Sequence, residues 1–294
     1  MHAAPDTRQP TPPSRPAASA SADVVDPYDA LGDLYDEWVV SVTEDIPFYL
    51  ALADRSVVTV AASDLNAARI VELGAGSGRV TNPLLARAHE VWAVDIAAGQ
   101  LARAAASAAD QGYAAQLHTV VADMRALDHT PASTTFAPLA SSIDLVIAPF
   151  RALLHVAPDA TKVFTAVCAL LRPDGMVAFD VFHPTPAVMD GIDGVWQLRR
   201  RLDRDGGERW AIWERATLSA DGEELILDVR CDRQDLPTEP SRSASMLLHV
   251  PPPHHWSDAI AAAGLELVSV SGWFDESPFE PGMTDSVWIA RRPE

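Results

Sequence analysis

Apolar positions in the middle of the chain form short continuous runs that alternate with stretches of helical spacing. The runs cover 69–73, 90–95, 117–122, 143–148 and 176–182, and they predict five strands. The stretches between them predict helices over 79–88, 98–111 and 159–171. Nearly continuous apolar strands that alternate with helices are typical of a parallel sheet covered on both faces. The pattern therefore predicts an α/β fold.

The pattern changes after Pro186. Segments 194–202, 209–219, 223–235 and 242–250 alternate in the manner of half-buried strands. Turn residues separate them at 205–207 and 220–222. We expect an antiparallel insertion of three or four strands, followed by a helix over 254–263 and by two last strands over 265–273 and 285–291.

The N-terminal part divides into a tail and a helical segment. Residues 1–22 are rich in proline, alanine and serine and lack an apolar core, which predicts a disordered tail and not a signal peptide. From Tyr28 to Ala53 the spacing is helical, and Ile46-Pro47 is expected to divide it into two helices over a cleft. One face carries Leu31, Leu34, Tyr35 and Trp38. The expected units are thus the tail (1–22), a helical cap (23–60), a core (61–186), a β insertion (187–250) and a closing segment (251–294).

Composition narrows the classes of function. Among 294 residues, 22 are Lys or Arg and 41 are Asp or Glu, so the net charge is −19 at pH 7. Binding to nucleic acid requires a basic surface, and this charge argues against such a partner. Two cysteines make no disulfide framework, and no stretch approaches the ~20 apolar residues of a membrane span. We expect a soluble cytoplasmic protein.

Three alternating glycines follow the first strand of the core. They are Gly74, Gly76 and Gly78, preceded by Glu72 and followed by Arg79. A strand, a glycine turn and a helix start allow the backbone to approach a nucleotide-like ligand closely. The dinucleotide fingerprint would place a glycine at position 79, where this chain has arginine, so an NAD site is disfavoured.

Acidic residues end the next two strands, Asp95 in Val-Trp-Ala-Val-Asp-Ile and Asp123 before Met124. Together with the glycine loop, they resemble the motifs of class I methyltransferases that depend on S-adenosylmethionine (SAM). The resemblance covers about residues 28–183, and the C-terminal strands in outline. It implies a Rossmann-like, seven-stranded, mostly parallel sheet with helices on both faces, here with an antiparallel β insertion. It also implies SAM as the cofactor.

The resemblance assigns roles around the cofactor. Asp95 would accept hydrogen bonds from both ribose hydroxyls, with Gly74, Ala75 and Gly76 as the loop. Asp123 would face the adenine amino group, with capping of a helix as its alternative role, and Met124 and Ile96 would pack on the adenine. Glu72 acts at the methionine amino end or supports the loop.

Aromatic side chains are candidates for the site because their faces attract a sulfonium cation. Tyr35 and Phe150 are assigned to the cofactor and Trp38 to the acceptor, with core packing as the alternative role for each.

Candidate catalytic residues follow the fourth strand of the core. If 151–156 forms one helical turn, Arg151 and His155 share a face at the carboxyl edge of the sheet. The segment resembles the corresponding region of small-molecule N-methyltransferases. An ordinary histidine pKa near 6.5 suits His155 as a general base at neutral pH. Asp180 and His183 are candidates for binding the acceptor, or else cap the loop there.

Two further observations limit the prediction. His254, His255 and Asp258 have no ligand set that completes a metal site, so we predict none. Ala97 and Gln100 stand where Ser or Thr and Met are frequent in the family.

The sequence therefore predicts a SAM-dependent methyltransferase that acts on N or O of a small-molecule acceptor. The alternative is a protein that binds SAM but does not transfer a methyl group: an enzyme that catalyses another transfer or a cyclisation, or a SAM sensor. An NAD(P)-dependent oxidoreductase is less favoured. Trp196, Trp210 and Trp213 in the insertion line either a hydrophobic pocket or the face of a homodimer.

Overall fold

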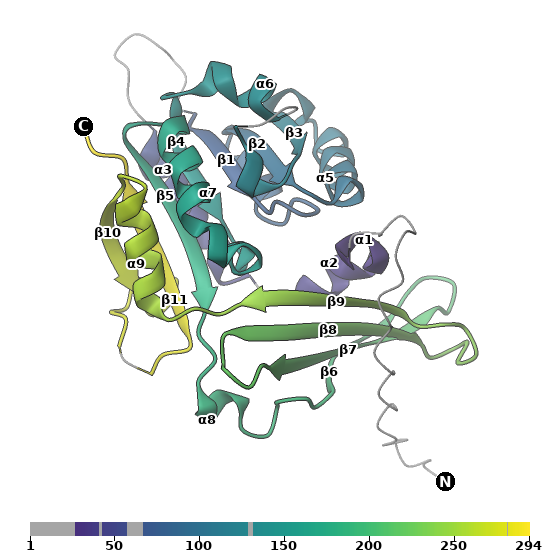
Figure 1. The fold of residues 1–294 in the computed structure, drawn as a ribbon. Helices are drawn as coiled ribbons and strands as arrows, with labels where there is room; N and C mark the ends of the chain where they lie inside the picture. The colour runs from purple at the N-terminus through teal and green to yellow at the C-terminus, as the bar shows by residue number, and fades with distance from the viewer. Residues whose placement is uncertain (1–26, 41–42, 58–66, 129–131, 281) are drawn as a thin grey trace.

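The computed structural model describes residues 27–40, 43–57, 67–128, 132–280 and 282–294. The expected tail over 1–22 lies outside these ranges. The chain forms two sheets, a seven-stranded one and a four-stranded one, with short helices between them (Figure 1).

The larger sheet has the strand order β10-β11-β5-β4-β1-β2-β3. Strands β1 to β5 are mutually parallel, whereas β11 is antiparallel to both of its neighbours, β5 and β10. The strand bounds are β1 Arg69–Leu73, β2 Glu90–Asp95, β3 Leu117–Val121, β4 Ile143–Ala148, β5 Leu171–Phe182, β10 Glu266–Ser271 and β11 Asp285–Arg291. The predicted Rossmann-like, mostly parallel sheet is confirmed.

Both faces of this sheet are buried because successive strand residues point to opposite sides. Val71 and Leu73 pack with α7 (Ala160–Leu170) and α9 (Pro253–Ala262) on one face. Ile70 packs with α3 (Asp45–Ser56) and α4 (Thr81–Ala86) on the other, where α5 (Ala98–Asp110) also contributes. The strands are apolar at successive positions because a layer of helices covers each face of the sheet.

The insertion forms the second sheet, with the order β6-β7-β8-β9 and antiparallel pairing throughout. Its bounds are β6 Gln197–Asp203, β7 Arg209–Leu218, β8 Glu224–Arg233 and β9 Arg242–His249, and α8 (Pro186–Met189) leads into it. Its apolar face packs against α1 (Pro27–Leu31) and α2 (Leu34–Val39), which lie between the two sheets (Figure 1). The expected antiparallel insertion is confirmed, with four strands.

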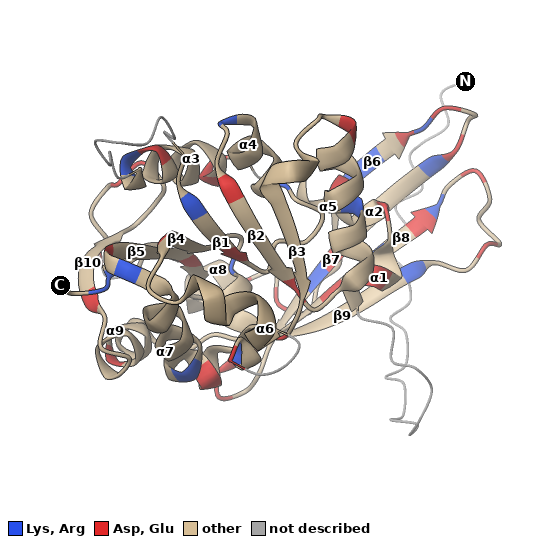
Figure 2. Ribbon diagram, turned by 90° about the horizontal axis from the view of Figure 1, so that it is seen from above, with Lys and Arg blue, Asp and Glu red and all other residues tan. Residues whose placement is uncertain are grey.

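Charged residues of both signs lie along the insertion strands, as Figure 2 shows from above. Many of them pair across the sheet; for example, Arg215 and Asp228 are 2.6 Å apart on β7 and β8. Arg200 of β6 lies 3.2 Å from Glu37 of α2. Basic side chains of the insertion therefore take part in ion pairs that tie its strands to each other and to α2.

Two boundaries differ from the prediction. Pro47 lies in the first turn of α3 and does not interrupt a helix, because proline lacks only an N–H that has no partner there. Strand β5 begins at Leu171, earlier than expected, and runs through Pro173 and Asp174. Asp174 adopts a left-handed φ of 60°, and its N–H donates to the Arg292 carbonyl at 3.0 Å. A segment that resembles a turn in sequence therefore remains in the sheet.

No helix in the part of the chain that the structure describes has the length and apolar character needed to cross a membrane.

Candidate functional site

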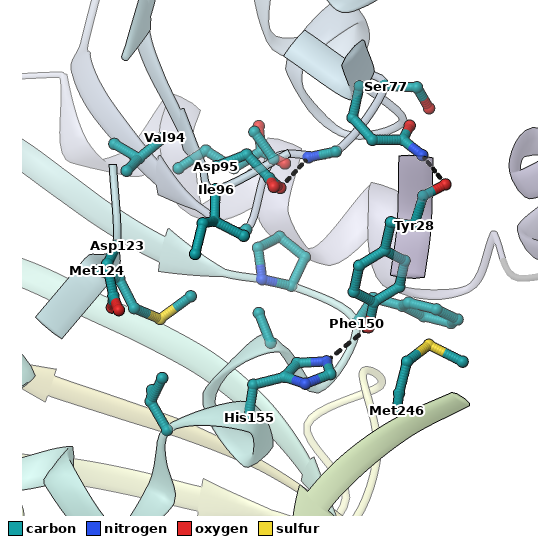
Figure 3. A pocket seen from close by; sticks show the side chains of 18 of the residues that line it. Tyr28, Ser77, Val94, Asp95, Ile96, Asp123, Met124, Phe150, His155 and Met246 are labelled. Atoms are coloured by element: carbon teal, nitrogen blue, oxygen red, sulfur yellow. Dashed lines mark hydrogen bonds between the residues drawn. The ribbon is translucent and has the colours of Figure 1, made fainter. Parts of the chain in front are cut away.

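A cavity of about 280 Å³ opens where the carboxyl ends of β1, β2 and β4 meet the small helices and the insertion sheet (Figure 3). Its walls come from seven segments of the chain. They are α1–α2 (Pro27, Tyr28, Tyr35), β1 and the β1–α4 loop (Glu72, Gly74, Ala75, Gly76, Ser77, Arg79, Val80), the end of β2 (Val94–Ile96), the start of α5 (Gln100), the residues after β3 (Ala122–Arg125), the segment after β4 (Pro149, Phe150, Ala152, His155, Val156) and β9 (Ser245–Leu247). An open α/β sheet commonly binds its ligand at this edge.

The glycine loop can have this path only because of its glycines. Gly74, Gly76 and Gly78 have φ values of +72°, +57° and +92°, which residues with a Cβ rarely adopt. A Cβ on Gly74 would lie 2.8 Å from the Cβ of Ala152. The loop therefore packs directly against the segment after β4, and its backbone forms a wall of the cavity.

Asp95 fixes this loop at the end of β2. Its Oδ2 accepts a hydrogen bond from the Gly76 N–H at 2.8 Å, and its Oδ1 accepts one from the Ala97 N–H at 2.8 Å. Its carboxylate lines the cavity, as do the side chains of Ile96 and Met124. Of the residues assigned to the cofactor, the structure brings together Tyr35, Glu72, Gly74, Ala75, Gly76, Asp95, Ile96, Asp123, Met124 and Phe150.

Beneath the loop lies a buried group of charges. Glu72 is 2% exposed and accepts a hydrogen bond from the Thr81 hydroxyl at 2.6 Å. Burial raises the pKa of Glu72 to about 7. Arg79 donates two hydrogen bonds to Asp45, at 2.7 and 2.6 Å, and its guanidinium lies 5.2 Å from the Phe150 ring centre. The side chain that argued against NAD thus ties the loop to α3.

Asp123 lies just past β3 at the edge of the cavity. It lines the cavity and also caps the short helix Met124–Ala126, because its Oδ1 accepts from the Arg125 N–H at 2.8 Å. The Arg125 guanidinium donates to its carboxylate at 2.6 Å, and these hydrogen bonds lower the pKa of Asp123. Asp123 is therefore ionised at neutral pH.

Aromatic rings form the wall nearest the insertion. Tyr28 meets Tyr35 edge-on with ring centres 5.4 Å apart, and Tyr35 meets Trp38 at 5.9 Å. The Trp38 Nε1 donates to Glu214 Oε2 on β7 at 2.9 Å, and its side chain is 9% exposed. Trp38 is not one of the described residues that line the cavity. Trp38 packs α2 against the insertion, and its assignment to the acceptor stays a prediction.

His155 lines the cavity with its Nε2 2.6 Å from the hydroxyl oxygen of Tyr28 (Figure 3). Burial lowers the pKa of His155 to about 4, so the ring is uncharged at neutral pH. The expectation of a pKa near 6.5 is therefore wrong. Tyr28 did not enter the predicted site, although it opens the amphipathic N-terminal helical segment.

Arg151 and His155 do not share a helical face. Residues Ala152–His155 form a 3₁₀ helix with three residues per turn, so positions four apart point in different directions. Arg151 precedes it with a φ of 62° and donates to Asp285 on β11 at 2.7 Å. Its guanidinium covers the ring of Phe182 at 4.8 Å. Arg151 is not among the described residues that line the cavity, and its catalytic assignment stays a prediction.

Asp180 and His183 also lie apart from the described cavity walls. Asp180 is buried and accepts hydrogen bonds from the Tyr49 hydroxyl at 2.7 Å and from the N–H groups of Phe150 and Arg151 at 2.9 and 3.0 Å. Burial raises the pKa of Asp180 to about 6. The His183 Nε2 lies 2.8 Å from the Ser286 hydroxyl, and burial lowers its pKa. Asp180 thus holds the backbone after β4, and the assignment of both residues to the acceptor stays a prediction.

Strand β9 supplies wall residues that the sequence did not reveal. Ser245, Met246 and Leu247 line the cavity from the insertion sheet. Their alternating pattern indicates a strand, but it does not say which strand of four lies beside the core. In the described ranges, no group of three His, Cys, Asp or Glu side chains is arranged to hold a metal ion.

Comparison with known proteins identifies the fold. Residues 70–175 match the family model described as a methyltransferase domain. Over this range, which is little more than a third of the chain, the chain is similar to methyltransferase domains. The matched range starts in β1 and ends in β5, so it contains the glycine loop and both strand-end acids, Asp95 and Asp123.

Among curated proteins, methyltransferase gedG of Aspergillus terreus is 29% identical over 136 residues, which is 46% of this chain and 37% of that protein. The chain thus matches little more than a third of that relative's length. Among solved structures, the CcbJ methyltransferase from Streptomyces caelestis has a TM-score of 0.72 at 20% identity, covering 92% of this chain and 99% of its own. SAM-bound CalS10 from Micromonospora echinaspora, an amino pentose methyltransferase, has a TM-score of 0.61 at 22% identity. The alignment covers 88% of this chain and 97% of CalS10. At these identities the structures show a shared fold, insertion included.

Proposed function

We propose that the cavity binds SAM and that the enzyme transfers its methyl group to N or O of a small-molecule acceptor. The observation that carries the proposal is that the Asp95 carboxylate holds the glycine loop at the carboxyl ends of β1 and β2. The residues present fit the cofactor, because one cavity is lined by the Asp95 carboxylate and by the apolar side chains of Ile96 and Met124.

Each end of the cofactor has a candidate partner. In this proposal Asp95 accepts hydrogen bonds from the ribose, and Asp123, Met124 and Ile96, which line the same cavity, hold the adenine. Glu72 acts at the methionine end or supports the loop. SAM supplies a methyl group already activated by the sulfonium, so the enzyme's main contribution is alignment, for which effective molarity provides up to ~7–11 kcal/mol.

The acceptor side is formed by Tyr28, Phe150, His155 and Met246 (Figure 3). His155 with a pKa of about 4 is deprotonated at neutral pH but is a weak base. It therefore contributes most by orienting the Tyr28 hydroxyl, which donates to His155 and whose oxygen accepts a hydrogen bond from the acceptor nucleophile. The acceptor gains the methyl group and loses its proton to solvent. In this proposal the insertion, 187–250, is the lid of the acceptor pocket and the helices of 23–60 are its cap.

The partner class follows from charge. Acidic residues line the cofactor end and the net charge is −19, which favours a small molecule over nucleic acid. Together with two cysteines in the chain, this favours a cytoplasmic enzyme.

Calorimetry with SAM and its product S-adenosylhomocysteine (SAH) tests the cofactor. We expect Asp95→Ala to weaken binding about 100-fold, since charge-assisted hydrogen bonds contribute ~1.5–3 kcal/mol each. Asp110→Ala, at the exposed end of α5, is the matched control and should bind as wild type. Equal affinity of Asp95→Ala and wild type would contradict the proposal.

Product mass then identifies the reaction. Incubation with labelled SAM and panels of amines and alcohols should give SAH and acceptors heavier by one methyl group. Release of another fragment of SAM would favour the alternative of a different transfer or cyclisation, and binding without turnover would favour a sensor.

A further inference from the structure

Two consecutive residues after β4 have a backbone conformation that residues with a Cβ rarely adopt. Phe150 has a φ of 56° and Arg151 has a φ of 62°. The left-handed region is unfavourable for such residues, and it persists only where the surrounding structure imposes it. The turn at Phe150 and Arg151 therefore depends on partners that hold it.

A buried carboxylate supplies these partners. Asp180 of β5 accepts hydrogen bonds from the N–H groups of Phe150 at 2.9 Å and of Arg151 at 3.0 Å. The Tyr49 hydroxyl of α3 donates to the same carboxylate at 2.7 Å. An ionised carboxylate accepts all three bonds, whereas a protonated carboxyl has to turn one of its oxygens into a donor. Asp180 thus ties the turn to β5 and to α3.

The turn directs its two side chains to different places. The Phe150 ring lines the cavity (Figure 3), whereas the Arg151 guanidinium pairs with Asp285 on β11 at 2.7 Å. The centre of the Phe150 ring lies 5.2 Å from the guanidinium of Arg79 in the glycine loop and 6.4 Å from the ring of Trp38 in α2. Phe150 therefore contacts both the loop of the proposed cofactor end and the helical cap.

A methyl group in transfer lies where the proposed cofactor and acceptor ends meet. We propose that Asp180 is a positioning residue for methyl transfer: by holding the left-handed turn, it keeps the face of the Phe150 ring toward the sulfonium of SAM. This inference rests on the proposed function and adds to it a residue that is not among the described lining residues. Aromatic faces attract cations, so the position of the ring sets how strongly the site favours a sulfonium over an uncharged thioether.

Calorimetry with SAM and with SAH measures this preference, because the two ligands differ only in the methyl group and its charge. Asp180→Asn keeps the size of the side chain but replaces one accepting oxygen by a donor. We expect the ratio of SAM affinity to SAH affinity to fall about fivefold in this variant. Asp174→Asn, at an exposed position of the same strand, is the matched control and should keep the wild-type ratio. Equal weakening of both ligands by Asp180→Asn, or no change, would overturn the inference.

A double-mutant cycle tests whether Asp180 acts through Phe150. Phe150→Leu removes the ring, so we expect it to lower the same ratio about fivefold. The ratio should fall no further in the double variant, since Asp180 then has no ring to position. Effects that multiply would show that the two residues act independently and would overturn the inference.

Tyr49→Phe is the second variant in case Asp180→Asn does not fold. It removes one of the three donors to Asp180 and leaves the carboxylate in place. We expect the ratio of SAM affinity to SAH affinity to fall about twofold, since part of the hold on the turn remains. An unchanged ratio in a folded Tyr49→Phe protein counts against the inference in the same way.

The pH dependence of the ratio provides a further readout. Burial raises the pKa of Asp180 to about 6, with contributions from Tyr49 and Asp45 of α3 and from Arg151. The wild-type ratio should therefore fall as the pH is lowered through 6, while that of Asp180→Asn should stay flat over the same range. Glu72, whose pKa is about 7, is present in both proteins and affects them alike. Parallel profiles of the two proteins would overturn the inference.

The outcomes separate this inference from the proposed function. If the wild type binds neither SAM nor SAH, both fail. If the wild type binds both ligands and the ratio does not depend on Asp180, the proposed function stands and only the positioning role is removed.

Discussion

The two ends of the cavity are built in different ways. The proposed cofactor end comes from strand ends: Gly74 follows β1, Asp95 is the last residue of β2, and Asp123 lies two residues past β3. The proposed acceptor end comes from side chains far apart in sequence, such as Tyr28, His155 and Met246. The edge of the sheet alone positions the residues at the strand ends. The residues of the other end come together only when the helices and the insertion pack against the sheet.

Asp95 and Asp180 show the same difference between two residues of one type. Both lie at or near the carboxyl ends of strands of one sheet. Asp95 holds a loop with both oxygens and still lines the cavity, while Asp180 is 7% exposed and is surrounded by three donors. Strand-end carboxylates therefore divide into ligand-facing and backbone-holding ones according to what packs over them.

The strongest test of this division is Asp180→Ala. It leaves a hydroxyl and two N–H groups without their acceptor, and it releases Phe150 and Arg151, which have φ values of 56° and 62°. We expect the free energy of unfolding in urea to fall by about 4 kcal/mol. Asp95→Ala should lose mainly affinity. A stable Asp180→Ala protein that has lost only acceptor binding would reverse the assignment.

Gly74→Ala tests the loop of the cofactor end. The added Cβ meets Ala152 at 2.8 Å on a backbone with φ +72°, so we expect about 3 kcal/mol of destabilisation and loss of detectable SAH binding. Gly112→Ala is the control, because its φ is +83° and no atom lies within 4 Å of the added Cβ. It should cost only about 1 kcal/mol and leave binding intact. Similar costs at both positions would show that conformation alone, and not contact with Ala152, requires the glycine.

Glu72 allows a pH test of the charges beneath the loop. Its pKa in the folded protein, about 7, lies above its ordinary 4.5. Its contribution to stability is therefore complete below the ordinary pKa and is lost as the pH rises through 7. Urea unfolding of Glu72→Gln and of the wild type is compared at acid and at mildly alkaline pH. We expect the free energy of unfolding of Glu72→Gln, minus that of the wild type, to rise by about 2 kcal/mol from the acid to the alkaline pH. Parallel pH profiles would show that Glu72 is not desolvated in the folded protein.

Tyr28→Phe has the smallest expected effect and addresses the acceptor end. Removing the hydroxyl near His155 should lower kcat/KM about fivefold, close to 1 kcal/mol, with unchanged SAH affinity. Tyr113→Phe, in the loop after α5, is the control and should match wild type. Unchanged turnover in Tyr28→Phe would remove this hydroxyl from the acceptor site.

Which predictions succeeded follows from the range of the interactions involved. Strands β2 and β4 were located to the residue, because a buried parallel strand must be apolar throughout and must end where polar residues begin. The loop glycines were also evident, since positive φ is a local requirement. The i, i+4 argument for Arg151 and His155 failed because a 3₁₀ turn and an α turn have the same apolar signature over four residues.

By itself, then, the sequence determined the layers of the fold and the cofactor edge, since local periodicity and glycine conformation are encoded residue by residue. Only the tertiary structure decided that Asp180 holds the backbone after β4 and that Arg151, His183 and Trp38 contact side chains of distant strands. It also decided that β9 lines the cavity and that Tyr28 meets His155. Those outcomes depend on burial and on pairs separated by more than a hundred residues in several cases, as with Tyr28 and His155, 127 positions apart. A local pattern carries no information about such distant partners.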